Sequence, residues 1–223
     1  MPTNIRTLTI FYDTRISHKE IPLFRGAVVN SLGDNANVLF HNHTEGDTHR
    51  YSYPLIQYKS INGKAAITCV EEGADIIGQF LSRASEPLFI GDREVLLEVG
   101  RIFPETTAIC ISDTFTSYRL QHWLPLNSHN YEQYRNADSL IERIQILENV
   151  LAGNILSFLT GVGIHLEERF DLKITDINHQ GLFTYKGVEL MAFDIAFKAN
   201  IALPSYIGIG KSASIGNGML TKE

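Results

Sequence analysis

The chain has 223 residues and a formal net charge of −6, with 44% hydrophobic and 20% charged residues. These values are typical of an ordinary soluble globular protein, and the length suits one large domain or two small ones. No apolar run approaches the length of a membrane span, so we expect no membrane partner.

The N-terminus and the two cysteines both favour a cytoplasmic location. Residues 1–8 lack the apolar region and the cleavage site of a signal peptide. Cys69 and Cys110 lie in apolar, strand-like runs, and we expect two buried thiols rather than a disulfide framework. A reducing cytoplasm fits these features.

The first half of the chain alternates strand-like and helix-like segments. A capping box of Ser17 and Glu20 predicts the start of a helix that Gly33 ends. The pair Asn62 and Gly63 predicts a two-residue type I′ hairpin turn. The segments follow in the ferredoxin-like order: strand 7–12, helix 17–32, strands 53–58 and 65–70, helix 71–82 and strand 87–90.

The second half begins with a strand-rich stretch, residues 94–124, in which we expect Trp123 to lie in the core. An apolar stripe over residues 136–163 predicts the clearest helix of the chain. Strand-like segments follow at 165–174, 182–186 and 188–203. We therefore expect an α+β fold of two tandem ferredoxin-like (RRM-like) domains, at 1–122 and 123–223, each an antiparallel sheet with helices on one face.

Two Gly-x-Gly pairs near the C-terminus, Gly208–Gly210 and Gly216–Gly218, have five residues between them. Glycine can adopt a positive φ and permits close backbone approach, so the N–H groups of this loop could face a phosphate, supported by Lys211. One alternative is a glycine-rich turn between two strands. Another is a P-loop, but Ser205 replaces its first glycine and the βαβ context is missing.

The sequence His41-Asn42-His43 is the candidate for chemistry. In an extended segment, residues i and i+2 face the same side about 7 Å apart, which suits two imidazoles around one phosphodiester. A histidine pKa near 6.5 suits both a base for the 2′-hydroxyl and an acid for the departing 5′-oxygen.

Three alternatives remain for these histidines. They could lie in an exposed polar loop, or they could bind zinc with His49, although no cysteine or acidic ligand follows at a recognisable spacing. The third alternative is the metal-dependent His-Asn-His nuclease, but the segment that follows is a strand hairpin and not the ββα unit of that nuclease.

Four stretches in order resemble the CRISPR repeat-processing endoribonuclease family, in its branch with paired histidines and a C-terminal glycine-rich loop. They are residues 21–27, 39–43 and 51–59 and the loop that follows Leu203 and Pro204. The resemblance extends from about Leu8 to Met219.

The resemblance implies that His41 and His43 are the base and the acid, in either order, and that Tyr51 is the tyrosine of the site, with Tyr53 second. The lysine that the family has near this site is absent from residues 28–37, which leaves its role to Arg25 or Lys59. Asn217 stands where an apolar residue is usual. The implied RNA-binding residues are Arg25, Lys59, Gly208, Gly210, Lys211, Ser212, Gly216 and Gly218.

The resemblance implies an endoribonuclease that needs no metal and no cofactor. It would cut CRISPR precursor RNA within the repeats to release guide RNAs with 2′,3′-cyclic phosphate and 5′-hydroxyl ends. The net charge of −6, the missing lysine and Asn217 motivate an alternative, a repeat-binding protein that does not cut or a subunit of an RNA-guided complex. The implied partner is CRISPR repeat RNA, with an effector complex and a homodimer as open alternatives.

Overall fold

The computed structural model describes residues 3–33, 36–41, 53–83, 86–185 and 187–223. The chain divides into two compact units between Thr107 and Ala108. The N-terminal unit also contains Ser214–Gly216, and the C-terminal unit contains Asn217–Glu223. This division lies one strand before the expected boundary after residue 122, because the strand over residues 111–123 pairs with later strands of the C-terminal unit.

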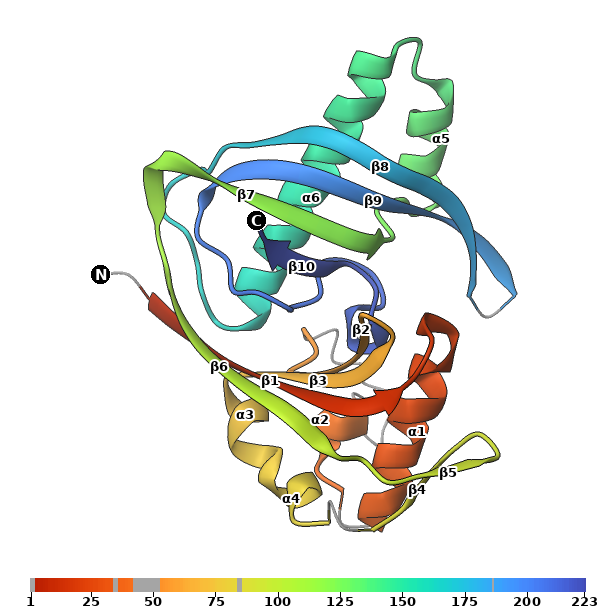
Figure 1. Cartoon of the computed structure of the whole chain (residues 1–223). Helices are drawn as coiled ribbons and strands as arrows, with labels where there is room; N and C mark the ends of the chain where they lie inside the picture. The colour runs from red at the N-terminus through yellow and green to blue at the C-terminus, as the bar shows by residue number, and fades with distance from the viewer. Residues whose placement is uncertain (1–2, 34–35, 42–52, 84–85, 186) are drawn as a thin grey trace. The chain divides into compact units, whose positions relative to one another are not determined.

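The sheet of the N-terminal unit has the strand order of a ferredoxin-like fold, β2-β3-β1-β6. Its β1–β3 and β2–β3 pairs are antiparallel. Figure 1 shows the helices of this unit on one face of the sheet. The elements are β1 (Thr3–Arg15), η1 (His18–Glu20), α1 (Ile21–Leu32), α2 (Val38–His41), β2 (Ile56–Ile61), β3 (Lys64–Val70), α3 (Glu72–Ile76), α4 (Gly78–Leu81) and β6 (Val99–Ile109).

The fourth strand of this sheet is β6, and the prediction that residues 87–90 fill that place is wrong. Those residues do form a strand, β4 (Leu88–Ile90), but it makes a hairpin with β5 (Arg93–Val95). A three-residue strand offers few ladder hydrogen bonds, whereas the 11 residues of β6 can pair along much of β1.

Two local signals in this unit are confirmed. The Ser17 backbone N–H donates to the Glu20 carboxylate at 2.8 Å, which forms the capping box at the start of η1 and α1. Asn62 and Gly63 have φ of 53° and 73°, as the type I′ turn between β2 and β3 requires. Both signals involve neighbouring residues only, which explains why the sequence shows them.

The C-terminal unit repeats the same strand order, β10-β7-β9-β8. Figure 1 shows α6 crossing behind its strands. The segment 202–218, with the short η3 (Ala213–Ile215), stands in place of a second helix. Its other elements are β7 (Ile111–Trp123), α5 (Ser128–Asn136), α6 (Leu140–Gly161), β8 (Leu172–Tyr185), β9 (Val188–Ile201) and β10 (Met219–Lys222).

Several side-chain predictions have a clear outcome. Trp123 is fully buried, as predicted, and its indole N–H donates to Asn154 Oδ1 at 3.0 Å. Cys69 is buried as a free thiol, but the predicted burial of Cys110 is wrong because this residue lies exposed between β6 and β7. None of the described helices has both the length and the apolar character needed to cross a bilayer.

Candidate functional site

The candidate catalytic residues lie at the edge of the described chain. His41 is the last residue of α2, whereas His43 and Tyr51, like His49 of the zinc alternative, lie outside the described residues. The expected extended conformation is wrong at residue 41, which is helical. Asn37 Oδ1 accepts the Leu39 N–H at 3.0 Å, and this local hydrogen bond starts the helix.

The helix α2 is anchored to the core of the N-terminal unit. Phe40 is 1% exposed, and its carbonyl accepts a hydrogen bond from the Tyr58 hydroxyl at 3.5 Å. The Tyr58 ring packs edge-on against Phe24 of α1, with the ring centroids 5.7 Å apart. The backbone immediately before His41 is therefore held by buried contacts.

Arg25 lies next to this anchor. Burial raises the pKa of Tyr58, and the positive charge of Arg25 acts in the opposite direction. A Cβ atom built on the neighbouring Gly26 would meet nothing within 4 Å. Among the described residues, none therefore encloses the Gly26 position.

Lys59 does not lie on the surface, in contrast to what a phosphate-binding lysine requires. The side chain is fully buried, and its Nζ donates to Gln57 Oε1 at 3.0 Å. The Gln57 amide in turn donates to the Tyr53 hydroxyl at 2.7 Å and to the Pro54 carbonyl at 2.9 Å. Lys59 and Gln57 thus fix the hydroxyl of Tyr53, the second choice for the tyrosine of the site.

The sequence could not show this burial because both faces of β2 are covered. Tyr58 points toward α1, while Gln57 and Lys59 lie on the other side of the strand and are also fully buried. The strand therefore lacks the alternation of apolar and polar residues that identifies a solvent-exposed face.

The glycine-rich loop is tightly packed at its glycine positions, where side chains do not fit. A Cβ atom on Gly218 would lie 1.9 Å from the Ile209 carbonyl oxygen, and φ at this position is +64°. A Cβ atom on Gly208 would lie 2.7 Å from the Ala213 Cβ, and one on Gly210 would lie 2.6 Å from Asn154 Oδ1. The glycines therefore satisfy a packing requirement, in addition to any contact with an anion.

The accessible part of the loop lies between the two glycine pairs. Lys211 is exposed, and Ser212 is half-buried with a positive φ of 60°. Gly216 belongs to the N-terminal unit, where its Cβ position lies 3.4 Å from the Tyr58 carbonyl oxygen and 2.5 Å from Ile21 Cδ1. The loop therefore presents a lysine and a hydroxyl while its glycines are enclosed.

Asn217 is the one polar side chain in the loop that is buried without compensation. It is 1% exposed, and neither its Oδ1 nor its Nδ2 atom has a hydrogen-bond partner in the described part of the chain. An unpaired buried amide costs about 1–3 kcal/mol.

Sequence reasoning missed His122, which lies beside the loop. It has φ of 51° at an irregularity of the β7–β9 pairing, where Asp194 Oδ1 accepts its N–H at 2.6 Å. Its carbonyl accepts the Gly218 N–H at 3.1 Å. A single histidine in a strand-rich stretch gives no sequence signal for such a position.

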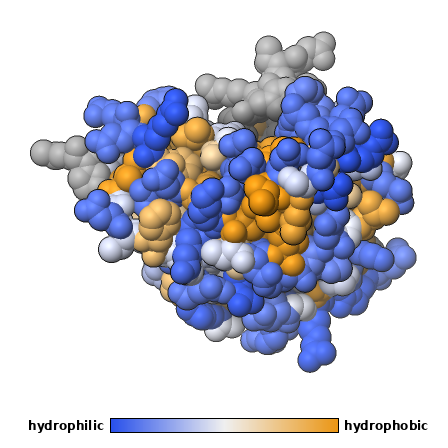
Figure 2. Space-filling model, turned by 90° about the horizontal axis from the view of Figure 1, so that it is seen from above, coloured by the Kyte–Doolittle hydropathy of each residue, from blue (hydrophilic) through white to orange (hydrophobic). Residues whose placement is uncertain are grey.

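The C-terminal unit also has a groove that none of the predicted site residues lines. In the described ranges, no three or more His, Cys, Asp or Glu side chains are arranged to bind a metal. The groove, of about 510 Å³, lies between α5 and the β8–β9 hairpin and is lined by Tyr131, Leu182 and Val188 among others. Figure 2 shows an apolar patch among mainly polar side chains on the face seen from above.

The strand order of both units defines a protein of two tandem ferredoxin-like domains. Sequence models of the Cas6b N-terminal and C-terminal domains match residues 3–108 and 110–223, so the chain belongs to the Cas6b family. The protein MJ0978 of Methanocaldococcus jannaschii is 28% identical over 113 residues, which cover 50% of this chain and 76% of that protein.

Solved structures agree with this assignment. A crystal structure of Cas6b has a TM-score of 0.90 at 25% identity and covers 99% of this chain and 100% of its own. A crystal structure of the CRISPR RNA processing endoribonuclease Cas6b has a TM-score of 0.76 at 25% identity with the same coverage. The type IV Cas6 crRNA endonuclease Csf5, with a TM-score of 0.58 at 12% identity and again 99% and 100% coverage, shares the fold alone.

The burial of Lys59 predicts a pH-dependent stability. Desolvation lowers the Lys59 pKa to about 7 in the folded protein, whereas the unfolded chain keeps a pKa near 10.5. Between these values the unfolded state binds the extra proton, so the contribution of Lys59 to stability rises with pH and its penalty is fully present below pH 7. Relative to Lys59→Met, the unfolding free energy of the wild type should rise by up to about 1.4 kcal/mol per pH unit from pH 7 to 9. The unfolding free energies are measured by urea titration at each pH. If those of the wild type and of Lys59→Met changed with pH by the same amount, this explanation would be contradicted.

The packing of Gly218 predicts a large difference between two alanine substitutions. Gly163, with φ of +79° and nothing within 4 Å of its Cβ position, is the matched control. Gly163→Ala should cost about 1–2 kcal/mol for the left-handed backbone alone. Gly218→Ala should cost clearly more because the Ile209 carbonyl must also move. Equal shifts of the denaturation midpoint would show that the loop can relax.

The unpaired amide of Asn217 predicts that Asn217→Leu stabilises the protein by about 1–3 kcal/mol. The control is Asn154→Leu, which removes the acceptor of the Trp123 indole and should destabilise the protein. Thermal denaturation of both variants measures the two signs. A destabilising Asn217→Leu substitution would mean that the amide has a polar partner.

Proposed function

We propose that this protein is a metal-independent endoribonuclease that cleaves CRISPR precursor RNA within its repeats and so releases guide RNAs in the cytoplasm. The observation that carries the proposal is the match of both halves to Cas6b domains, together with full-length similarity to a CRISPR RNA processing endoribonuclease. The substrate and partner is then the CRISPR repeat RNA.

In the proposed reaction, one histidine of the pair His41 and His43 removes the proton of the 2′-hydroxyl. The 2′-oxygen attacks the adjacent phosphorus, the bond to the 5′-oxygen breaks, and the other histidine gives a proton to that oxygen. The products are a 2′,3′-cyclic phosphate and a 5′-hydroxyl, and no water, metal or cofactor is consumed. The buried anchor of α2 supports this role because it holds the backbone before His41.

A tyrosine hydroxyl near the phosphate would stabilise its growing negative charge. Tyr51 is the first candidate for this role. Tyr53 gains support from its hydrogen bond with Gln57, which fixes the position of its hydroxyl. In this arrangement Lys59 does not contact the phosphate directly. It donates to Gln57 and so helps to position the Tyr53 hydroxyl.

The proposed RNA-binding residues divide into two groups. Exposed Lys211, half-buried Ser212 and Arg25 next to the α2 anchor have side chains suited to phosphate. The glycines contribute by shaping the loop that presents Lys211 and Ser212. This glycine group is Gly208, Gly210, Gly216 and Gly218.

A second candidate function is a repeat-binding protein that does not cut, alone or as a subunit of an RNA-guided complex. Two observations favour it. Lys59 is fully buried, whereas the family's active-site lysine would have to act at the surface. Asn217 leaves an unpaired amide inside the glycine loop. A homodimer is compatible with either function.

The proposal predicts that His41→Ala and His43→Ala each slow single-turnover cleavage of the cognate repeat by at least about a hundredfold, because positioned acid–base groups contribute on that scale. His165→Ala, which changes an exposed histidine of the C-terminal unit, is the control and should cut as fast as wild type. Excess EDTA is present throughout. Wild-type rates in both active-site variants would exclude the paired-histidine mechanism, and binding without cleavage by the wild type would favour the second candidate.

A further inference from the structure

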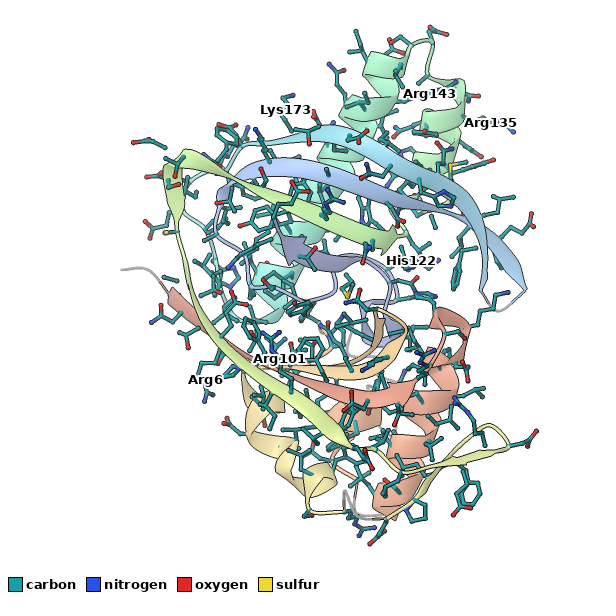
Figure 3. The ribbon with its side chains drawn as sticks, in the orientation of Figure 1. Arg6, Arg101, His122, Arg135, Arg143 and Lys173 are labelled. Carbon is teal, nitrogen blue, oxygen red and sulfur yellow. The ribbon has the colours of Figure 1, made fainter. Side chains whose placement is uncertain are left out.

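The N-terminal sheet carries an arginine in contact with two aromatic rings. Arg101 of β6 has its Cζ 5.4 Å from the ring centre of Phe11 and 5.0 Å from that of Phe103. Phe11 lies on β1, the neighbour of β6 in the sheet. We name Arg101, Phe11 and Phe103 the arginine–aromatic surface. Figure 3 labels Arg101 on the N-terminal unit.

This surface lies on the side of the sheet opposite α1. Tyr12, the next residue along β1, is buried and packs edge-on against Phe24 of α1. Because successive side chains of a strand point to opposite faces, Phe11 lies on the other face. Arg101 is exposed, and both phenylalanines are half-buried. A ligand can therefore reach the guanidinium and parts of the rings without displacing the helices.

Among the described residues, no carboxylate neutralises the charge of Arg101. No ion pair or hydrogen bond of its guanidinium is formed with any described residue, whereas exposed Arg6 pairs with Glu71 and Asp75. A guanidinium has five N–H donors in one plane, and the two rings hold that plane by cation–π contact. The chain as a whole carries a net charge of −6, so an unpaired arginine held in this way is a local site for an anion.

The chemistry of this surface fits a nucleotide better than a simple anion. A nucleotide supplies a flat base that stacks on aromatic rings and arginine planes, and a phosphate that pairs with the charge. In RRM domains, aromatic residues on the sheet stack two or three bases of single-stranded RNA.

This sheet has no aromatic pair on its two central strands, β1 and β3. The partner of Phe11 on β3 is Ala66, and the next pair on this face is Thr9 with Thr68, both buried with their hydroxyls 3.2 Å apart. The aromatic residues lie instead on β1 and the edge strand β6. A stacking site would therefore be displaced by one strand from the usual RRM position.

We propose that the arginine–aromatic surface binds one unpaired nucleotide of the RNA, with its base stacked on Arg101 or on an adjoining ring and its phosphate paired with the guanidinium. The inference rests on the proposed function only in that the protein binds RNA. It adds a binding site on the N-terminal sheet, made of residues other than the histidine pair and the glycine-rich loop.

The test measures the affinity of the full chain for repeat RNA by fluorescence anisotropy. Arg101→Gln should weaken binding about fivefold to a hundredfold, the range observed when one base-stacking contact is removed. Arg101→Lys keeps the charge but loses the plane and should also bind weakly, because stacking requires the guanidinium. The matched control Arg6→Gln, an exposed arginine of the same unit, should change affinity less than twofold.

A second measurement reports stacking directly and remains informative if a variant is less stable. The repeat is synthesised with 2-aminopurine at successive unpaired positions, and one position should be quenched by the wild type but not by Arg101→Gln. Phe103→Leu should reduce the same quenching. Circular dichroism confirms that each variant is folded.

The outcomes separate this proposal from the proposed function. The proposed nucleotide site would be contradicted if Arg101→Gln and Arg101→Lys both bound repeat RNA with wild-type affinity. It would also be contradicted if Arg101→Lys alone did so, because that result would indicate a charge contact without stacking. Unchanged RNA affinity together with lost affinity for a poly-glutamate peptide would assign the surface to an acidic protein segment and also overturn the proposal. RNA binding that depends on Arg101 without any cleavage would leave the surface intact and contradict only the nuclease, whereas a wild type that binds no RNA contradicts both.

Discussion

The structure depends on a loop whose glycine positions leave no room for side chains. In the C-terminal unit, the segment 202–218 replaces the second helix of a ferredoxin-like fold, and it fits because the backbone of Gly218 passes against the Ile209 carbonyl. Gly210 leaves space for the Asn154 amide that binds the Trp123 indole. The spacing of the glycines is therefore first a packing requirement, and the proposed phosphate contacts are assigned to Lys211 and Ser212.

The acidic composition is compatible with the proposed RNA partner because the proposal needs only a few basic side chains at defined positions. Arg101 is held by aromatic rings and Lys211 is presented by the loop, while several other basic side chains are occupied by carboxylates. Lys59 is different, because burial lowers its pKa and its amine supports Gln57 and Tyr53 instead of facing solvent. Net charge alone therefore says little about where RNA binds on this protein.

The sequence predicted the features that depend on neighbouring residues and on the order of segments. These include the capping box at Ser17, the turn at Asn62 and the tandem ferredoxin-like order. It failed where distant residues decide, as in the place of β6 as the fourth strand and the exposure of Cys110. In the candidate site, the order of motifs indicated the family, but the burial of Lys59 and the arginine–aromatic surface depend on which strands become neighbours, and no local pattern contains that information.

The most direct test of the central claim is end-group analysis of the cognate repeat cleaved by the wild-type protein in excess chelator. Attack by the 2′-hydroxyl with a histidine base and acid predicts a single cut with a 2′,3′-cyclic phosphate on one product and a 5′-hydroxyl on the other. Cleavage that requires added metal, or products with a 3′-hydroxyl and a 5′-phosphate, would contradict the mechanism.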